Sequence, residues 1–379
     1  MEPQCRPLRA PVHDIPDPRQ ARDRRHPLAA ILALMCVAML CGYRSSSAIA
    51  DWGRCYGQKL ARALGFTHNQ TPCAATLHRV LRRLDGSLVE AALGAWADSI
   101  LTALPPAAGE PEALAIDGKT LRGSRRQGAP AVHLLAVLSH RLGLTVWQQA
   151  VADKTHEIPV LEDVLRGLLL EGRVITVDAL LTPRAIAQRL VEGGGDYVMM
   201  VKGNQPQLPH DIRLVFQEPT ALAETMTACD TVDHGHGRLE ERRLTASTAR
   251  VESSDGPGLA QVFQVERRVT IKKSGAQRTE VVYGVTSLSP ERAGPDGLLR
   301  LVRQHWQIEN QVHWVRDVTF DEDRSQVRCG SIPQVMAAFR NTAIGLLHWA
   351  GETNIAAACR RFAAQPWLAL ALIGITPDN

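Results

Sequence analysis

The sequence has no apolar run long enough to cross a membrane. Its longest one occupies 28–41, whereas a spanning helix needs roughly 18 or more apolar residues. The run follows an Arg-rich lead at some distance from the start, unlike the apolar core of a signal peptide. We therefore predict a buried helix at 28–41 and no membrane partner, with a spanning helix as the less favoured interpretation.

The sequence also lacks a Cys-x-x-Cys pair and a strong net charge. Several of its eight cysteines lie in apolar runs, which indicates free thiols in a reducing, cytoplasmic compartment. The formal net charge of +4 says little, but two segments are locally basic. These contain Arg79, Arg82 and Arg83 in one, and Lys119, Arg122, Arg125 and Arg126 in the other. Such clusters favour contact with a polyanion, and for either one alone solvated surface charge is an equal alternative.

Helical patterning dominates the first quarter of the chain. Residues 1–25 are rich in Pro, Arg and Asp and are predicted to form a loose arm. Thr71-Pro72 predicts the start of a helix over 74–84, with its arginines largely off the buried face. We predict an all-helical domain at 1–103 that either binds DNA or caps the next domain, followed by a linker at 103–112.

The remainder is typical of the α/β class. Strands are predicted at 113–116, 133–139, 144–152, 173–177 and 197–201, and helices at 158–170 and 182–192. This alternation predicts a mixed sheet whose first part spans 113–229. A β-rich insertion at 230–290 follows, and 291–379 returns to helices, beginning with one at 296–316.

Two aspartates occupy equivalent positions, because Asp117 and Asp178 each follow a short buried strand. Open α/β folds bind ligands at such strand ends. Taken singly, either residue is more often a turn or helix cap than a catalytic group. Together, and with a basic segment after the first, they favour a catalytic site.

A third acid lies on the helix at 296–316. At about 100° per residue, four polar side chains share an arc of roughly 80°. These are His305, Glu309, His313 and Arg316, beside an apolar arc of Leu301, Ile308, Val312 and Val315. The acid is either an ion-pair anchor or a metal ligand with phosphate-binding neighbours. The acidic residues 321–323 are rivals for the third ligand, and zinc bound by His305, Glu309 and His313 is a further, weaker alternative, because no HExxH motif is present.

Three carboxylates with few other ligands suit Mg²⁺, which retains several waters. Two such ions can activate an attacking oxygen and stabilise a leaving one. The pattern therefore favours phosphodiester chemistry on DNA, with salt-sensitive binding through the surrounding cations.

Four sequence blocks resemble one family. They are AIDGKTLRGS (115–124), VITVDALLTPRAIAQRLVEGGGDYVMMVKGNQ (174–205), HGRLEERR (236–243) and HWQIENQVHWVRDVTFDEDRSQVR (305–328). In this order they resemble the H-repeat-associated (ISAs-type) insertion-sequence transposases of the DDE class, over nearly the whole chain. The resemblance implies an RNase H-like core interrupted by a β-rich insertion. The spacings of 61 residues between Asp117 and Asp178, and of 131 residues between Asp178 and Glu309, agree with such an insertion.

The resemblance also implies roles for individual residues. Asp117, Asp178 and Glu309 would form the catalytic, metal-binding triad, with two Mg²⁺ or Mn²⁺ ions. DNA or phosphate contacts would come from Lys119, Arg122, Lys202, Asn204, Gln205, His305, His313 and Arg316. The activity implied is DNA cleavage and strand transfer, and the alternative is an inactive DNA-binding remnant. The expected partners are double-stranded transposon ends, target DNA and further copies of the chain, in a bacterial cytoplasm at the nucleoid.

Overall fold

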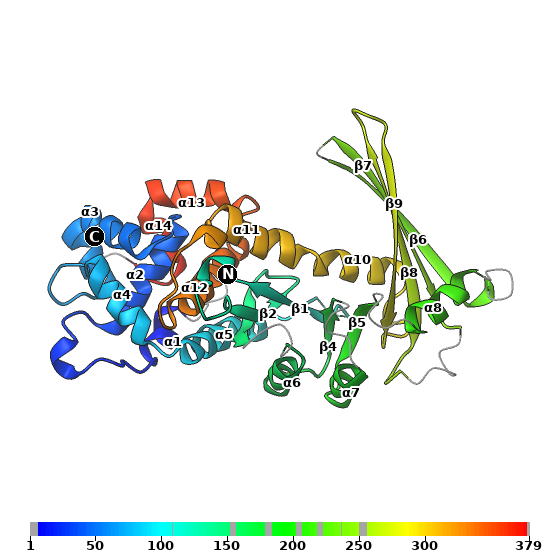
Figure 1. Ribbon diagram of the computed structural model, residues 1–379, viewed down its shortest axis with the longest axis horizontal. Coiled ribbons are helices and arrows are strands. Elements are labelled where there is room, and N and C mark those ends of the chain that lie inside the picture. Colours follow the sequence, from blue (N-terminus) through cyan, green and yellow to red (C-terminus); the bar gives the residue numbers. More distant parts are fainter. Residues whose placement is uncertain are drawn as a thin grey trace. The chain divides into compact units, whose positions relative to one another are not determined.

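The chain is a mixed α/β protein with an N-terminal helical region. The computed structural model describes residues 7–107, 109–151, 157–178, 184–201, 207–217, 223–235, 237–249 and 256–376 (Figure 1). Two compact units are present. The first comprises 1–108, 118–157 and 307–379, and the second comprises 109–117 and 158–306.

The first unit is mainly helical. Its helices are α1 (Arg9–His13), α2 (Leu28–Leu40), α3 (Ser46–Leu64), α4 (Ala74–Arg83), α5 (Gly86–Ala103), α11 (Trp314–Val318), α12 (Ile332–Trp349), α13 (Ile355–Ala364) and α14 (Pro366–Leu372). The predicted apolar helix is α2, which is buried along almost its whole length and packs against α3, α12 and α13. Its apolar side chains therefore serve the core of this unit. None of the described helices is both long and apolar enough to span a membrane.

The N-terminal segment differs from the loose arm that the sequence predicted. Residues 9–13 form α1, and Leu8, Val12 and Ile15 are buried. Helix α4 also begins differently, because Cys73 rather than Thr71 occupies its N-cap position. Helix α1 was not predicted because its buried apolar residues, at positions 8, 12 and 15, are too few to form a recognisable period.

The first unit also contains a hairpin of β2 (His133–Ser139) and β3 (Thr145–Val151), together with the end of β1 (Glu112–Thr120). Helix α5 packs closely on β3 at Gly94. A Cβ atom at this position would stand 2.7 Å from the Val146 carbonyl oxygen. The absence of a side chain on Gly94 therefore allows the helix to approach the strand.

A buried polar cluster joins α5, β3 and α12. The Gln148 and Gln334 amides each donate to the Glu90 carboxylate, at 2.5 and 2.6 Å, and the Asn341 amide donates to Gln148 at 2.6 Å. Glu90 is only 4% exposed. Burial raises its pKa to about 7, although the two amide hydrogen bonds oppose the shift.

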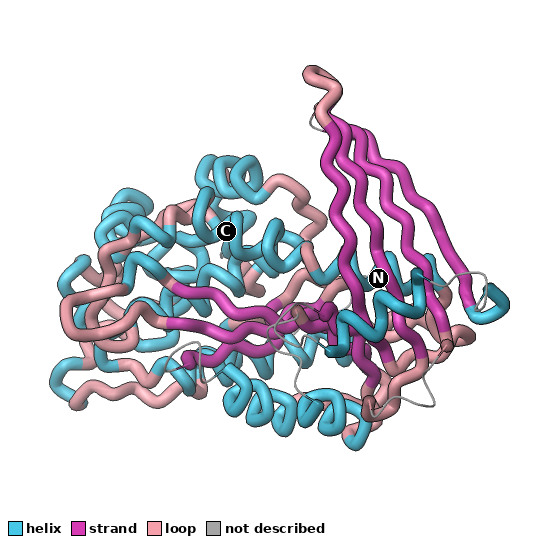
Figure 2. The backbone as a smooth tube through the Cα atoms, turned by 45° about the vertical axis from the view of Figure 1, so that its right-hand side comes forward, coloured by secondary structure: helices cyan, strands magenta, loops and turns pink. Residues whose placement is uncertain are grey.

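The second unit contains one sheet in the strand order β1-β4-β5-β9-β8-β7-β6. Its strands besides β1 are β4 (Arg173–Val177), β5 (Asp196–Val201), β6 (Met226–Gly235), β7 (Arg238–Ser247), β8 (Gln261–Ile271) and β9 (Gln277–Thr286). Strands β1, β4 and β5 run parallel to one another. In the rest of the order, β5-β9-β8-β7-β6, each strand is antiparallel to the next. The four long strands β6–β9 lie side by side (Figure 2), where the sequence predicted a β-rich insertion.

Helices complete the second unit. They are α6 (Glu157–Gly167), whose first residue belongs to the first unit, α7 (Arg184–Glu192), α8 (Gln207–Gln217) and α10 (Pro295–His305). Helix α10 contacts β4 to β7. Its Leu298, Leu299, Leu301 and Val302 form a core with Ala113, Val174, Val198 and Met200 of the parallel strands. This core fixes which face of the sheet α10 covers.

The pKa of Glu90 generates a prediction about stability. Folding raises this pKa from 4.5 to about 7, so the folded chain binds more protons than the unfolded chain between these values. The contribution of Glu90 to the unfolding free energy is therefore fully present below pH 4.5. It is lost as the pH rises to 7, by up to about 1.4 kcal/mol per pH unit. In urea unfolding at pH 5, 6, 7 and 8, Glu90→Gln should gain stability relative to wild type as the pH rises. A wild-type-to-variant difference that is the same at every pH would contradict this.

Candidate active site

Two aspartates lie at the same level of the parallel sheet. Strands β1 and β4 are adjacent and parallel, and their register pairs Ile116 with Val177. Asp117 and Asp178 are the next residues on each strand. Neighbouring strands lie about 4.8 Å apart, so the two residues are neighbours across this pair of strands, and both are half-buried. Asp178 directly follows β4, as predicted, whereas Asp117 lies within β1, which continues to Thr120 instead of ending at residue 116.

Both aspartates fall on the face of the sheet that α10 covers. Ala113 and Val174 contribute to the α10 core, and side chains alternate between the two faces of a strand. Continuing that alternation places Asp117 and Asp178, each four residues further on, on the same face. The end of α10 reaches this level too, because His305 Nδ1 lies 2.9 Å from the Thr176 hydroxyl, two residues before Asp178.

The helix predicted at 296–316 is interrupted. Helix α10 ends at His305, a π-helical turn occupies Ile308–His313, and α11 follows. A π-turn bonds each residue to the fifth rather than the fourth, so a constant 100° per residue no longer applies beyond it. The predicted apolar arc is buried as expected, and Glu309 is exposed.

Two members of the predicted polar arc lie elsewhere. His305 is only 5% exposed and is bonded to Thr176 in the second unit, and Arg316 is fully buried in the first. The guanidinium of Arg316 contacts the Glu322 carboxylate at 2.7 Å and Asn341 Oδ1 at 3.3 Å. The expected phosphate contact of Arg316 is therefore replaced by a buried ion pair.

The acidic residues 321–323 have partners of their own. Glu322 is 3% exposed and lies between Arg316 and Arg340, whose Nη1 is 2.7 Å away. Burial raises the pKa of Glu322, but the two guanidinium groups outweigh burial and the net shift is downward. Asp321 lies 3.8 Å from Arg44, and Asp323 lies 3.7 Å from Arg122. Glu322 is therefore a buried anchor of the first unit, and Asp321 and Asp323 each lie near an exposed arginine.

His313 is neutral at neutral pH. Burial, followed by the nearby charges of Arg316 and Lys119, lowers its pKa to about 3. An uncharged imidazole supplies no net positive charge to a phosphate. The sequence pattern could not indicate this, because burial at the π-turn depends on the packing around it.

The strand end that follows Asp117 is tightly packed within the first unit. Lys119 Nζ lies 2.6 Å from the Asp317 carboxylate and is only 9% exposed. A Cβ atom at Gly118 would stand 2.8 Å from His133 Nε2 and 3.0 Å from Glu157 Oε1, two side chains that form an ion pair. Glycine after Asp117 is thus required by the His133–Glu157 pair, and Lys119 joins the strand end to α11.

The other predicted DNA-contact residues divide into two groups. Arg122 is exposed at the surface of the first unit, 3.7 Å from Asp323. Lys202, Asn204 and Gln205 lie outside the described residues.

Sequence reasoning missed Thr176, Asp317, His133 and Glu157. Strand alternation could have placed Thr176 on the face of Asp178, since the two are separated by one residue. The other three are brought to Gly118 and Lys119 by tertiary packing, for which the sequence carries no periodic signal.

A metal cluster with three protein ligands is not seen in the part of the chain that the structure describes. There, no group of three or more His, Cys, Asp or Glu side chains could hold a metal ion. Neither His305, Glu309 and His313 nor Asp117, Asp178 and Glu309 form such a group among these residues. The aspartate pair of the second unit presents two carboxylates, and Glu309 belongs to the first unit.

Comparison with known proteins gives consistent matches. A family model described as "Transposase DDE domain" matches residues 108–346, and one described as "DDE_Tnp_1-associated" matches 11–97. An uncharacterized protein in the dhlA 3′ region of Xanthobacter autotrophicus is 36% identical over 67% of this chain and 86% of its own length.

Two Escherichia coli proteins are similar over more of the chain. The "H repeat-associated putative transposase YhhI" of strain K12 is 28% identical, over 88% of each chain. The "Putative transposase YncI" of O157:H7 is 28% identical over 88% of this chain and 85% of its own length.

The charged cluster around Glu322 predicts a large effect of a small substitution. Glu322→Gln leaves two buried guanidinium groups without a compensating charge, which should lower the unfolding free energy by about 3–5 kcal/mol. Urea denaturation measures this change. The matched control is Asp323→Asn. Asp323 is the next residue in the chain and pairs with the exposed Arg122, so this substitution should cost less than about 1 kcal/mol. Equal losses in the two variants would refute the assignment of Glu322 as the buried anchor.

Proposed function

Because this chain belongs to the transposase DDE-domain family, we propose that it catalyses metal-dependent DNA cleavage and strand transfer of an insertion sequence. Asp117, Asp178 and Glu309 are the proposed catalytic and metal-binding carboxylates. The observation that carries the proposal is the register of β1 and β4, which sets two aspartates at one level on one face of a parallel sheet. We further propose that this sheet is the RNase H-like core that the sequence blocks imply.

The path of the chain supports the proposed role of Glu309. His305 is bonded to Thr176, two residues before Asp178, and Glu309 is four residues after His305. A chain of four residues spans at most about 14 Å even when extended. Glu309 is exposed, whereas Glu322 is already paired with two arginines. These facts favour Glu309 over the acids at 321–323.

The donor set fits a hard divalent cation. Asp117 and Asp178 supply only carboxylate oxygens, and Mg²⁺ or Mn²⁺ accepts such ligands while it retains waters and binds substrate phosphates. Two ions held by the three acids would supply charge stabilisation at the attacking and leaving oxygens of the phosphodiester. Water and then a 3′-hydroxyl would be the successive nucleophiles.

Several other residues act by positioning. The hydrogen bond between Thr176 and His305 holds the end of α10 beside β4. The Lys119–Asp317 pair holds the strand end after Asp117 against α11. Gly118 leaves room for His133 and Glu157. Arg122, which is exposed, is proposed to contact phosphate, and contacts by Lys202, Asn204 and Gln205 are proposed from the sequence blocks alone.

The proposed partners are the double-stranded ends of the element, target DNA and further copies of this chain. Strand transfer joins two ends to a target, which requires a synaptic complex. The exposed basic residues of the first unit support binding to the DNA backbone, and such binding weakens as salt rises.

The decisive test is a cleavage and joining assay with the full chain and duplex DNA from the flanks of its reading frame. Wild type should nick and join in Mg²⁺ or Mn²⁺ and be inactive in EDTA. Asp117→Asn, Asp178→Asn and Glu309→Gln should each slow the reaction by roughly a thousandfold. Removing one ligand forfeits several kcal/mol of transition-state stabilisation, and each 1.36 kcal/mol is tenfold in rate.

Asp163→Asn serves as the matched control, because Asp163 is exposed and its partner Arg166 is exposed too. It should cleave and join like wild type. Activity that is unchanged in all three triad variants would overturn the proposed site. Full activity of Glu309→Gln alone, with loss in both aspartate variants, would transfer the third role to another acid.

A further inference from the structure

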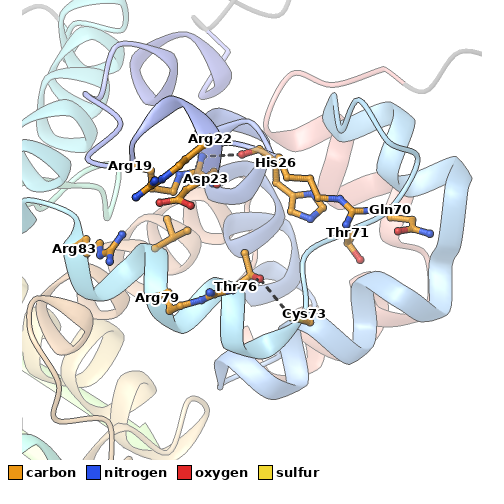
Figure 3. Close-up of a pocket in the computed structure, with 12 residues that line it drawn as sticks. Arg19, Arg22, Asp23, His26, Gln70, Thr71, Cys73, Thr76, Arg79 and Arg83 are labelled. Atoms are coloured by element: carbon orange, nitrogen blue, oxygen red, sulfur yellow. Dashed lines mark hydrogen bonds between the residues drawn. The ribbon is translucent and has the colours of Figure 1, made fainter.

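A pocket lies in the N-terminal helical region, outside the proposed active site. Its volume is about 670 Å³, and it belongs to the first unit. Residues of α4 and of the segment 19–26 form most of its lining (Figure 3). Its lining residues are Arg19, Arg22, Asp23, Arg25, His26, Gln70, Thr71, Cys73, Thr76, Arg79, Val80 and Arg83. Five of these are arginines and only one is an acid, so the pocket is suited to an anion.

Four of the five arginines are available to a ligand. Arg22, Arg25, Arg79 and Arg83 are exposed, and none of them has a carboxylate partner within 4 Å among the described residues. Arg79 makes only weak local hydrogen bonds, at 3.3–3.4 Å, to Thr76 and the Ala75 carbonyl. Guanidinium groups in this state bind phosphate oxygens with little competition from the protein.

The fifth arginine organises the wall. Arg19 is 5% exposed, and its guanidinium forms a two-point pair with Asp17, at 2.9 and 2.7 Å. The same side chain donates to the His26 carbonyl at 2.7 Å. Arg19 therefore holds the segment that carries Arg22, Arg25 and His26 in a defined shape.

His26 gives an independent indication of a ligand. It is 9% exposed and lines the pocket, and its Nδ1 has no hydrogen-bond partner among the residues that the structure describes. The ring packs edge-on against Phe66, with centroids 5.6 Å apart. A buried polar atom without a partner is costly, and an anion with which it could share a hydrogen bond would relieve that cost.

We propose that this pocket binds backbone phosphates of duplex DNA, so that the N-terminal helical region acts as a sequence-independent clamp on the element end. The inference rests on the proposed function for the identity of the nucleic acid. The exposed arginines come from two separate segments, 19–26 and α4, as a run of neighbouring phosphates requires. No Phe, Tyr or Trp lines the pocket, which disfavours a free nucleotide, because bases usually stack on aromatic side chains.

The test measures equilibrium binding of the full chain to fluorescent duplex DNA in EDTA, across a range of salt concentrations. The variant Arg79→Gln/Arg83→Gln should bind between about tenfold and a hundredfold more weakly at 0.1 M salt. Its salt dependence should fall by about two in log–log slope, since each lost phosphate contact removes about 0.9. Arg22→Gln/Arg25→Gln should behave in the same way.

Arg82→Gln is the matched control, because Arg82 is an exposed arginine on the same helix and does not line the pocket. It should change the slope by less than half as much as one pocket arginine. Thermal unfolding of each variant shows whether the fold is retained, as expected for exposed residues. Equal affinities and slopes for wild type and both double variants would overturn the proposal.

Two further measurements separate the possible failures. Asp163→Asn should bind DNA in EDTA like wild type. Because no metal-dependent cleavage takes place in EDTA, loss of DNA affinity in the pocket variants supports the clamp even if no strand transfer is found. Conversely, if wild type cleaves and joins DNA and the pocket variants bind DNA as tightly as wild type, the clamp proposal is wrong and the proposed function stands. Inorganic phosphate and a mononucleotide are titrated in parallel. If they bind at low millimolar concentration in wild type only, while DNA affinity is unchanged by the variants, the pocket is a small-anion site and the DNA assignment is wrong.

Discussion

Parallel pairing of β1 with β4 is the constraint on which the proposed chemistry depends. The register sets Ile116 against Val177, so the two following aspartates lie at one level. A shift of one residue would turn one carboxylate to the opposite face. The core between α10 and both strands prevents such a shift, because Ala113 and Val174 would leave it. The apolar residues of this core thereby determine where the carboxylates lie.

The π-helical turn at Ile308–His313 shows how one local irregularity redistributes a set of side chains. A uniform helix would have placed His305, Glu309, His313 and Arg316 along one face. Instead, His305 is bonded to Thr176 in the second unit, Arg316 is buried with Glu322 in the first, and Glu309 is exposed. π-turns occur often at functional sites. Here the turn contains the exposed Glu309.

Much of the fold was accessible from the sequence, and less of the site. Short buried strands such as 173–177 and the apolar helix α2 can be recognised from composition and length. Their predicted bounds agree with those in the structure to within a residue or two. Asp178 follows a strand end as predicted, whereas Asp117 lies within β1, which is longer than the predicted strand. The burial of Arg316 and the pairing of Lys119 with Asp317 did not, because each joins residues whose proximity depends on tertiary packing. Two pocket arginines, Arg79 and Arg83, belonged to the basic cluster recognised in the sequence, whereas Arg19, Arg22 and Arg25 fell in the segment 1–25 that was expected to be loose.

The buried group of Arg316, Glu322 and Arg340 has an evolutionary consequence. Removing one member leaves like charges or a lone charge out of water, while replacing all three with apolar residues of similar size is often tolerated. A lineage that changes one residue at a time must therefore pass through a poorly folded ancestor to reach the apolar alternative. The three residues are expected to be inherited together or lost together with the fold, which makes them a simple marker for separating intact copies from decaying ones in a collection of related genes.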